Sequence, residues 1–112
     1  MVDYAAEDGL NILTYLGLTN LTEREREVFR EKWKEVYEQR GENPIMATWH
    51  LYSEVLPFTC GDRDRGSFLT QGIRDEEFDK RLKETGLVRK FNEGTTLKDI
   101  FTASPERFAR TN

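Results

Sequence analysis

Hydrophobic and polar positions along this chain repeat with the period of an α-helix over most of its length. In residues 6–16, apolar side chains recur every three or four positions, with Asp3 as the candidate N-cap and Gly17 as the stop. The same spacing returns in residues 22–40, where the apolar stripe comprises Phe29, Trp33, Val36 and Tyr37. Both patterns predict helices that pack one face on a core.

The helix over residues 22–40 has recognisable signals at both ends. Thr22 and Glu25 form the T-x-x-E pattern of a capping box, in which each side chain accepts a hydrogen bond from the backbone N–H of the other residue. Gly41 stands where a left-handed residue commonly ends a helix. Acidic and basic residues lie three apart between these ends, which predicts ordinary surface pairing for most of the charge.

The most apolar stretch of the chain covers residues 44–56. Asn43 and Pro44 suit the N-cap and first position of a helix, and Pro57 is expected to end it. Between these signals, apolar residues occur on nearly every side of the helix: Ile45, Met46, Ala47, Trp49, Leu51, Tyr52, Val55 and Leu56. A helix that is apolar all round is usually buried, so residues 44–56 are expected to form the central helix of the fold.

Shorter helices are expected in the second half of the chain. Asp75 is the candidate N-cap of a helix that ends at Gly86, and residues 87–91 form either a short helix or an extended piece. The other candidate starts are Ser67, Thr96 and Ser104. A small hairpin within 57–74 or 86–96 is left open, because periodicity does not decide between structures over so few residues.

Length and composition agree with one helical domain. A chain of 112 residues has room for one core, and 37% hydrophobic with 12% aromatic residues is a globular composition. We expect an all-α, or mostly α, single compact domain spanning residues 1–112, with four to six short helices around the central buried helix 44–56.

Cysteine content and hydropathy bear on the compartment. A single cysteine forms no internal disulfide, and the N-terminal sequence is acidic where a secretory signal would be basic and then apolar. The longest apolar run is interrupted by His50, Glu54 and Pro57, and it is shorter than the roughly 20 residues that span a bilayer. We expect a soluble, cytoplasmic protein without a membrane partner.

The net charge of −4 argues against a protein that coats nucleic acid, because Lys and Arg supply most non-specific affinity for phosphates. Charge is unevenly distributed, however: residues 1–56 carry −5 and residues 57–112 carry +1. A nucleic-acid accessory role is therefore kept as an alternative, through the basic residues of 80–90: Lys80, Arg81, Lys83, Arg89 and Lys90.

Two short segments resemble known families. LTEREREVF, from Leu21 to Phe29, resembles the start of LuxR-type helix-turn-helix domains. That family requires a polar and basic recognition helix next, and the largely apolar GENPIMATWHLY follows here, so the resemblance does not extend to DNA readout. Residues 95–109 are similar to an N-terminal stretch of glucose-6-phosphate isomerases that lacks their catalytic residues, and this similarity implies no activity.

Candidate catalytic chemistry centres on the only histidine and the only cysteine. His50 and Cys60, with Glu54 nearby in sequence, suggest a small metal- or cysteine-dependent enzyme, because imidazole and thiolate are zinc ligands and a Cys–His pair can act as nucleophile and base. A structural zinc site would need about two more such ligands. No phosphate-binding loop, nucleophile elbow or H-E-x-x-H motif is present, so we predict no catalytic residue, metal or cofactor.

The charged loop, defined as residues 57–66 with the sequence PFTCGDRDRG, is the main candidate for function. Asp62, Arg63, Asp64 and Arg65 lie between two glycines, and Phe58 precedes them. Arginine and aromatic residues are frequent at interface hot spots, and Arg binds carboxylates through two hydrogen bonds. The alternative is a solvated turn in which the aspartates cap the backbone.

These observations favour a small soluble, non-enzymatic protein-binding module, acting as a regulator, inhibitor or accessory subunit. The expected binding residues are Phe58, Asp62, Arg63, Asp64 and Arg65, and the expected partner is another protein. The enzyme centred on His50 and Cys60 and the nucleic-acid accessory protein are the alternatives. The oligomeric state is left open.

Overall fold

The computed structural model describes residues 4–19, 21–41, 43–60 and 68–103, apart from the side chains of residues 60 and 68–71. Every regular element in these ranges is helical. They are α1 (Ala6–Tyr15), α2 (Glu23–Gln39), α3 (Pro44–His50), the π-helical turn η1 (Leu51–Val55), α4 (Leu56–Cys60), α5 (Phe68–Thr85), α6 (Leu87–Asn92) and α7 (Leu97–Thr102). Because α3, η1 and α4 follow one another without a break, they form one continuous helix. The described part of the chain therefore contains six helices. The all-α prediction is confirmed.

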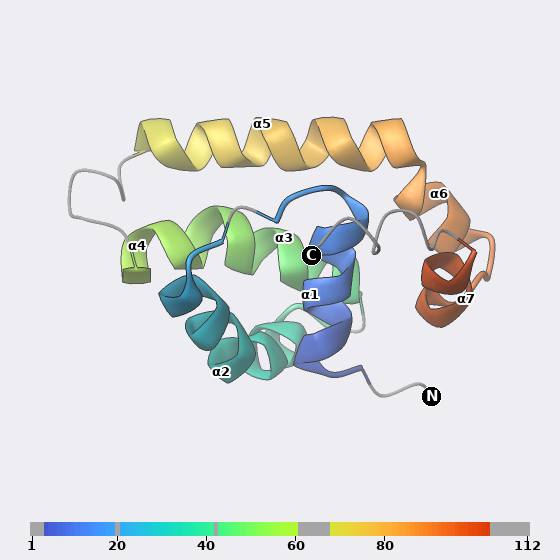
Figure 1. Ribbon diagram of the computed structural model, residues 1–112, viewed down its shortest axis with the longest axis horizontal. Helices are drawn as coiled ribbons and strands as arrows, with labels where there is room; N and C mark the ends of the chain where they lie inside the picture. The colour runs from blue at the N-terminus through green and yellow to red at the C-terminus, as the bar shows by residue number, and fades with distance from the viewer. Residues whose placement is uncertain (1–3, 20, 42, 61–67, 104–112) are drawn as a thin grey trace.

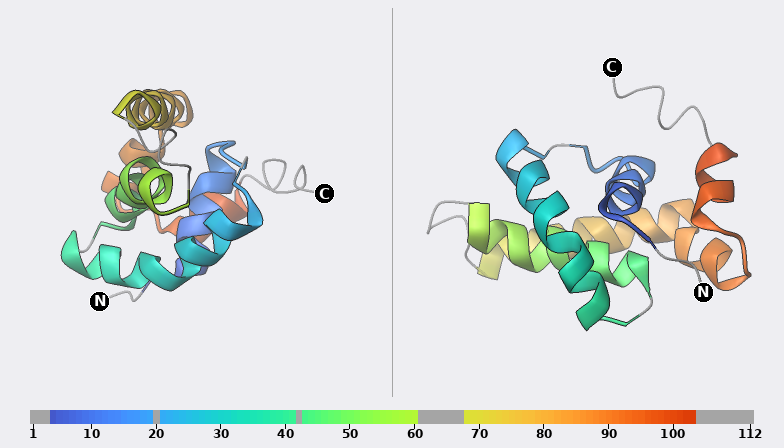
Figure 2. Two further views of the ribbon diagram at one scale, coloured as in Figure 1. Left: turned by 90° about the vertical axis from the view of Figure 1, so that its left-hand side faces the viewer. Right: turned by 90° about the horizontal axis from the view of Figure 1, so that it is seen from below.

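The helices lie in layers. In Figure 1, α5 extends along the top, and the continuous helix α3–η1–α4 lies beneath it with a nearly parallel axis but the opposite chain direction. The first two helices, α1 and α2, lie on the other side of α3–η1–α4, so this helix occupies the middle of the molecule (Figure 2). The short helices α6 and α7 lie beyond the C-terminal end of α5, where α7 packs against α1.

The core surrounds α3–η1–α4, as expected for a central helix. Ala47, Leu51, Tyr52 and Leu56 are almost completely buried. The other layers contribute four further large buried side chains, which are Tyr15, Phe29, Trp33 and Phe78. Met46 departs from the all-round apolar pattern, since it remains exposed on α3.

The end of α1 agrees with its sequence signal, while its start does not. Gly17 adopts a left-handed conformation with φ of 78°, and the N–H groups of Gly17 and Leu18 donate to the carbonyls of Thr14 and Leu13. This is the Schellman arrangement that glycine favours. Asp3, the expected N-cap, lies outside the described residues; the N-cap is Ala5, whose N–H donates to the Asp8 carboxylate at 2.8 Å.

The capping signals of α2 and α3 are confirmed. The Glu25 N–H donates to Thr22 Oγ1, and the Thr22 N–H donates to Glu25 Oε1, both at 3.1 Å. After α2, Gly41 has φ of 84°. Asn43 then accepts hydrogen bonds from the N–H groups of Ile45 and Met46 through its side chain, so α3 begins at Pro44 as expected.

Pro57 does not end the central helix, and the prediction that it would do so is wrong. The helix continues through Pro57 to Cys60, so only residues 61–66 of the charged loop lie beyond it. In an α-helix the Pro57 ring would clash with the Ser53 carbonyl and leave it without a donor. The wider turn η1 directly before Pro57 relieves this conflict, and the Leu56 N–H donates to the Leu51 carbonyl, five residues earlier.

The second half of the chain is more helical than its caps suggested. Asp75 is not an N-cap, because α5 starts at Phe68 and runs through it to Thr85. Gly86 ends α5 with φ of 67°, as expected, and residues 87–92 form the helix α6. The Thr96 side chain caps α7 by accepting from the Asp99 N–H at 3.1 Å. The suggested helix starts at Ser67 and Ser104 lie outside the described residues. A hairpin was left open within 57–74 or 86–96, and the described residues of both ranges contain no strand.

A glycine permits the close approach of α1 and α2. A Cβ atom at Gly9 would lie against Trp33 Nε1, 2.7 Å from Trp33 Cδ1 and 2.8 Å from Phe29 Cε1. The Trp33 indole is also bound to α3, because its N–H donates to Thr48 Oγ1 at 3.0 Å, and that hydroxyl donates to the Pro44 carbonyl. The contact therefore fixes α1, α2 and α3 together.

We predict that Gly9→Ala lowers the free energy of unfolding by about 2 kcal/mol or more, because the new methyl group forces the indole out of its packed position. Gly72→Ala is the matched control, since Gly72 is also helical and a Cβ atom there would have no neighbouring atom within 4 Å. It should raise the free energy of unfolding by about 0.5–1 kcal/mol through helix propensity. Urea denaturation of both variants measures the difference, and equal effects would contradict the packing argument.

Candidate functional site

Two exposed apolar side chains lie on either side of Asp62–Arg65 in the sequence. Phe58, in α4, is 57% exposed. Ile73, in α5, is also 57% exposed. Figure 1 shows that the end of α4 and the start of α5 lie at the same end of the molecule, and both residues are within two turns of these helix ends. The expected binding residues Asp62, Arg63, Asp64 and Arg65 lie outside the described residues.

Phe58 was predicted from the sequence as a contact residue, whereas Ile73 was not. An isolated isoleucine in a helical segment is normally assigned to the core, and only the packing of α5 shows that it points away from the core. The other exposed large apolar side chains of the described residues are Met46 at 42% and Val88 at 38%. Phe58 and Ile73 are therefore the most exposed apolar side chains of this class in the described chain.

His50 lies in a partly buried polar cluster at the end of α3. Its Nδ1 atom is 2.5 Å from Glu54 Oε2 and 2.6 Å from Arg40 Nη2, and this Arg40 nitrogen is 3.6 Å from the same Glu54 oxygen. The Arg40 guanidinium also lies over the Trp49 ring, 6.0 Å from its centroid. The cluster joins the C-terminal end of α2 to the central helix.

A single imidazole nitrogen does not serve both neighbours at once. When Nδ1 carries a proton it donates to Glu54, and when it does not it accepts from Arg40. The proton on His50 therefore selects which of the two contacts is favourable. In either case the Glu54 carboxylate stays within ion-pair distance of the Arg40 guanidinium.

The central helix separates His50 from Cys60. These residues are the last of α3 and the last of α4, ten positions apart in one continuous helix, which corresponds to about 15 Å along its axis. A zinc ion lies only about 2.0–2.3 Å from its ligands, so it would not bridge the two side chains across that distance. The geometry does not support a site shared by His50 and Cys60.

The described residues contain no group of three or more His, Cys, Asp or Glu side chains placed to hold a metal ion. None of the helices in these ranges is both long and apolar enough to cross a membrane.

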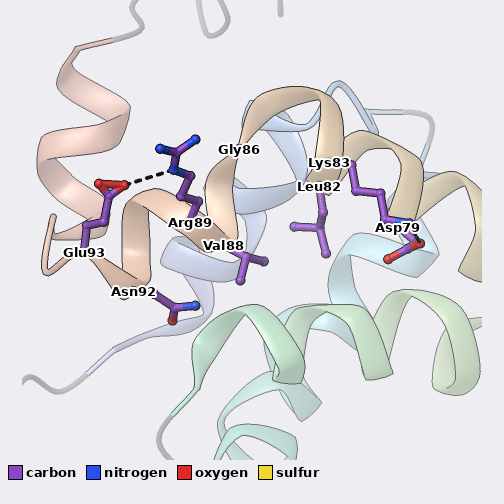
Figure 3. A pocket seen from close by; sticks show the side chains of 8 residues that line it. All are labelled: Asp79, Leu82, Lys83, Gly86, Val88, Arg89, Asn92 and Glu93. Carbon is purple, nitrogen blue, oxygen red and sulfur yellow. Dashed lines mark ion pairs between the residues drawn. The ribbon is translucent and has the colours of Figure 1, made fainter.

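A groove of about 740 Å³ lies at the corner between α5 and α6 (Figure 3). Its apolar lining comes from Leu82 and Val88. Two ion pairs border it: Lys83 Nζ is 3.2 Å from Asp79 Oδ2, and Arg89 Nε is 3.4 Å from Glu93 Oε1. Gly86 and Asn92 complete the lining.

Three of the five basic residues of 80–90 have local partners in this region. Besides the paired Lys83 and Arg89, the Lys90 ammonium donates to Tyr15 Oη at 3.0 Å. Arg81 lies beside Gly17, because a Cβ atom there would be 3.2 Å from its Nη1. Neighbouring carboxylates therefore compete with any phosphate for Lys83 and Arg89.

A largely buried ion pair links α2, η1 and α5. Arg74 Nη2 donates to Glu25 Oε2 at 2.8 Å, and Arg74 Nη1 donates to the Tyr52 carbonyl at 2.9 Å. The guanidinium also lies over the Tyr52 ring, 4.8 Å from its centroid. In the sequence, Glu25 is recognisable only as part of the capping box, and nothing signals Arg74, because the two residues are 49 positions apart.

Comparison of the chain with protein-family models, with curated proteins and with solved structures found no match. Inference about its function therefore rests on the geometry of these sites.

Ionisation of Tyr52, which lies beside the Arg74–Glu25 ion pair, makes the free energy of unfolding depend on pH. Burial raises the pKa of the Tyr52 phenol above its ordinary value of 10.0; Arg74 opposes this rise, whereas Glu77 and Glu25 add to it. The folded state thus retains the proton at a pH where the unfolded chain loses it. The resulting stabilisation is complete below the unfolded pKa and is lost as pH rises through the folded pKa.

We predict that the stability advantage of wild type over Tyr52→Phe shrinks as pH rises above about 10, at up to about 1.4 kcal/mol per pH unit. Urea unfolding of both proteins from about pH 9 to about pH 11 measures this difference. A difference that stays constant over that range would show that Tyr52 ionises alike in the folded and unfolded states.

Proposed function

We propose that this protein is a small cytoplasmic regulator, inhibitor or accessory subunit that binds another protein through the loop end. The loop end is defined as Phe58, Ile73 and the intervening charged segment Asp62–Arg65. The observation that carries the proposal is the equal 57% exposure of Phe58 and Ile73 on either side of that segment.

The apolar part of the loop end supplies the binding energy in this proposal. Burial of apolar surface is favourable by about 25 cal/mol per Å², and aromatic side chains account for much of the energy of protein interfaces. Phe58 is attached to a helix that is anchored in the core through Leu56 and Pro57, both of which are buried. A partner would therefore meet a side chain whose helix is already ordered, which lowers the entropy lost on binding.

The charged part of the loop end supplies specificity. Arg63 and Arg65 have the fork geometry that binds carboxylates, and Asp62 and Asp64 would pair with basic groups. A protein surface with charges of both signs complements this mixed segment better than a uniformly negative nucleic acid does. The local carboxylate partners of Lys83 and Arg89 also favour a protein partner over nucleic acid. The single cysteine supports a reducing compartment.

We predict that a double variant, Phe58→Ser with Ile73→Ser, reduces recovery of the partner at least about tenfold in quantitative pull-downs from cells of the natural source. Arg63→Ala with Arg65→Ala should also reduce it. Met46→Ser is the matched control, because Met46 is similarly exposed but lies at the opposite end of the central helix. Thermal unfolding of each variant establishes that it is folded.

The proposal is wrong if wild type and both double variants recover the same proteins in equal yield. Loss of recovery in the Met46 control as well would assign binding to a different or larger surface. Recovery that depends on nuclease-sensitive material would favour the nucleic-acid alternative.

A further inference from the structure

The part of α5 with described side chains, residues 72–85, buries few apolar groups for a helix that covers a core. From Gly72 onward, Phe78 is the only fully buried apolar side chain of α5, and Leu82 is partly buried. By contrast, α2, which has nearly the same length, buries five apolar side chains: Val28, Phe29, Trp33, Val36 and Tyr37. Residues 72–85 of α5 are therefore attached with less apolar burial than α2.

Polar groups take the place of apolar contacts where α5 meets η1. The Arg74–Glu25 ion pair is mostly removed from solvent, with the two side chains 20% and 10% exposed. Two further polar atoms, Asp75 Oδ1 on α5 and Ser53 Oγ on η1, are buried and have no hydrogen-bond partner within the described part of the chain. Desolvation of an ion pair offsets much of its Coulomb attraction, and an unpartnered buried oxygen is unfavourable. Opening of α5 would return Asp75 and the ion pair to water.

The C-terminal end of α5 is attached differently. Gly86 forms a left-handed joint between α5 and α6, and beyond it Leu87, Leu97 and Ile100 are at most 3% exposed. The Phe101 ring in α7 packs on Tyr15 of α1, with ring centroids 6.1 Å apart. The segment after the joint is thus held to α1 by apolar contacts that do not involve the inner face of α5.

We propose that α5 is a strap that opens as a unit about Gly86, while α1, α2, α3–η1–α4 and the α6–α7 segment stay folded. The Arg74 contacts to Glu25 and to the Tyr52 carbonyl hold it closed. Opening separates the Phe78 ring from the Tyr52 ring, whose centroids are 6.0 Å apart, and uncovers an apolar surface on the central helix. This inference does not rest on the proposed binding at the loop end, although opening would move Ile73 on α5 away from Phe58 on α4.

Native-state hydrogen exchange of the wild-type protein tests the proposal directly. We expect the amides of the middle of α5 to exchange through an opening at least about tenfold more frequent than the one that exposes the middle of α2. Mass spectrometry of peptides from the two helices, or NMR of individual amides, measures both under the same conditions. Identical opening frequencies in α5 and α2 would overturn the strap, and this result requires no variant.

Glu25→Gln tests the role of the ion pair. Glutamine preserves the capping box at the start of α2, but it leaves the Arg74 charge without its counter-ion. We expect exchange of α5 to accelerate by at least about tenfold, with little change in α2. The matched control is Asp79→Asn, which removes an exposed ion pair from the same helix and should leave the exchange of α5 nearly unchanged. Equal acceleration of α2 and α5 by Glu25→Gln would show that the ion pair stabilises the whole fold and that no separate strap exists.

Discussion

The arrangement of the three layers depends on the two oxygens of one carboxylate. Glu25 Oε1 completes the capping box of α2, and Glu25 Oε2 binds Arg74 from α5. Through its other terminal nitrogen, Arg74 binds the Tyr52 carbonyl in η1, so one chain of hydrogen bonds crosses from the first layer to the last. Apolar packing alone tolerates small shifts of one helix along another. These directional hydrogen bonds, by contrast, form at only one position of α5 along α2 and η1. A buried ion pair adds little net stability, and its stronger effect here is to set the position of α5.

Much of the fold could be predicted from the sequence, because many of its signals are local. Thr22 with Glu25, Asn43 with Pro44, and Gly17 and Gly41 each act through neighbouring backbone groups, and each is found where its pattern placed it. Asp75 shows the limit of such reasoning. An aspartate before an amphipathic segment is a typical N-cap residue. Here the seven residues before Asp75 are helical as well, so α5 already begins at Phe68.

The candidate sites could be predicted less well, because they depend on contacts between distant segments. Phe58 was identified as a candidate contact from its position next to the charged segment, and its exposure agrees with that role. Ile73 and Arg74 are adjacent in sequence, yet one points to solvent and the other into a buried ion pair with a residue from α2. Their separate environments follow from how α5 rests on η1. Similarly, His50 and Cys60 are near in sequence, but a continuous helix places them far apart.

The turn η1 has a consequence for the helix that follows it. A π-helical turn accommodates one residue more than an α-helical turn, so every later side chain is rotated by roughly 100° from its α-helical position. Without this rotation Phe58, seven residues after the buried Leu51, would lie on the same face as Leu51 and point into the core. Deletion of a single residue from this turn would remove the extra residue together with the π-helical turn, and would therefore leave Phe58 in its present outward orientation. The outward aromatic side chain at the loop end is therefore a product of helix phase as well as of residue identity.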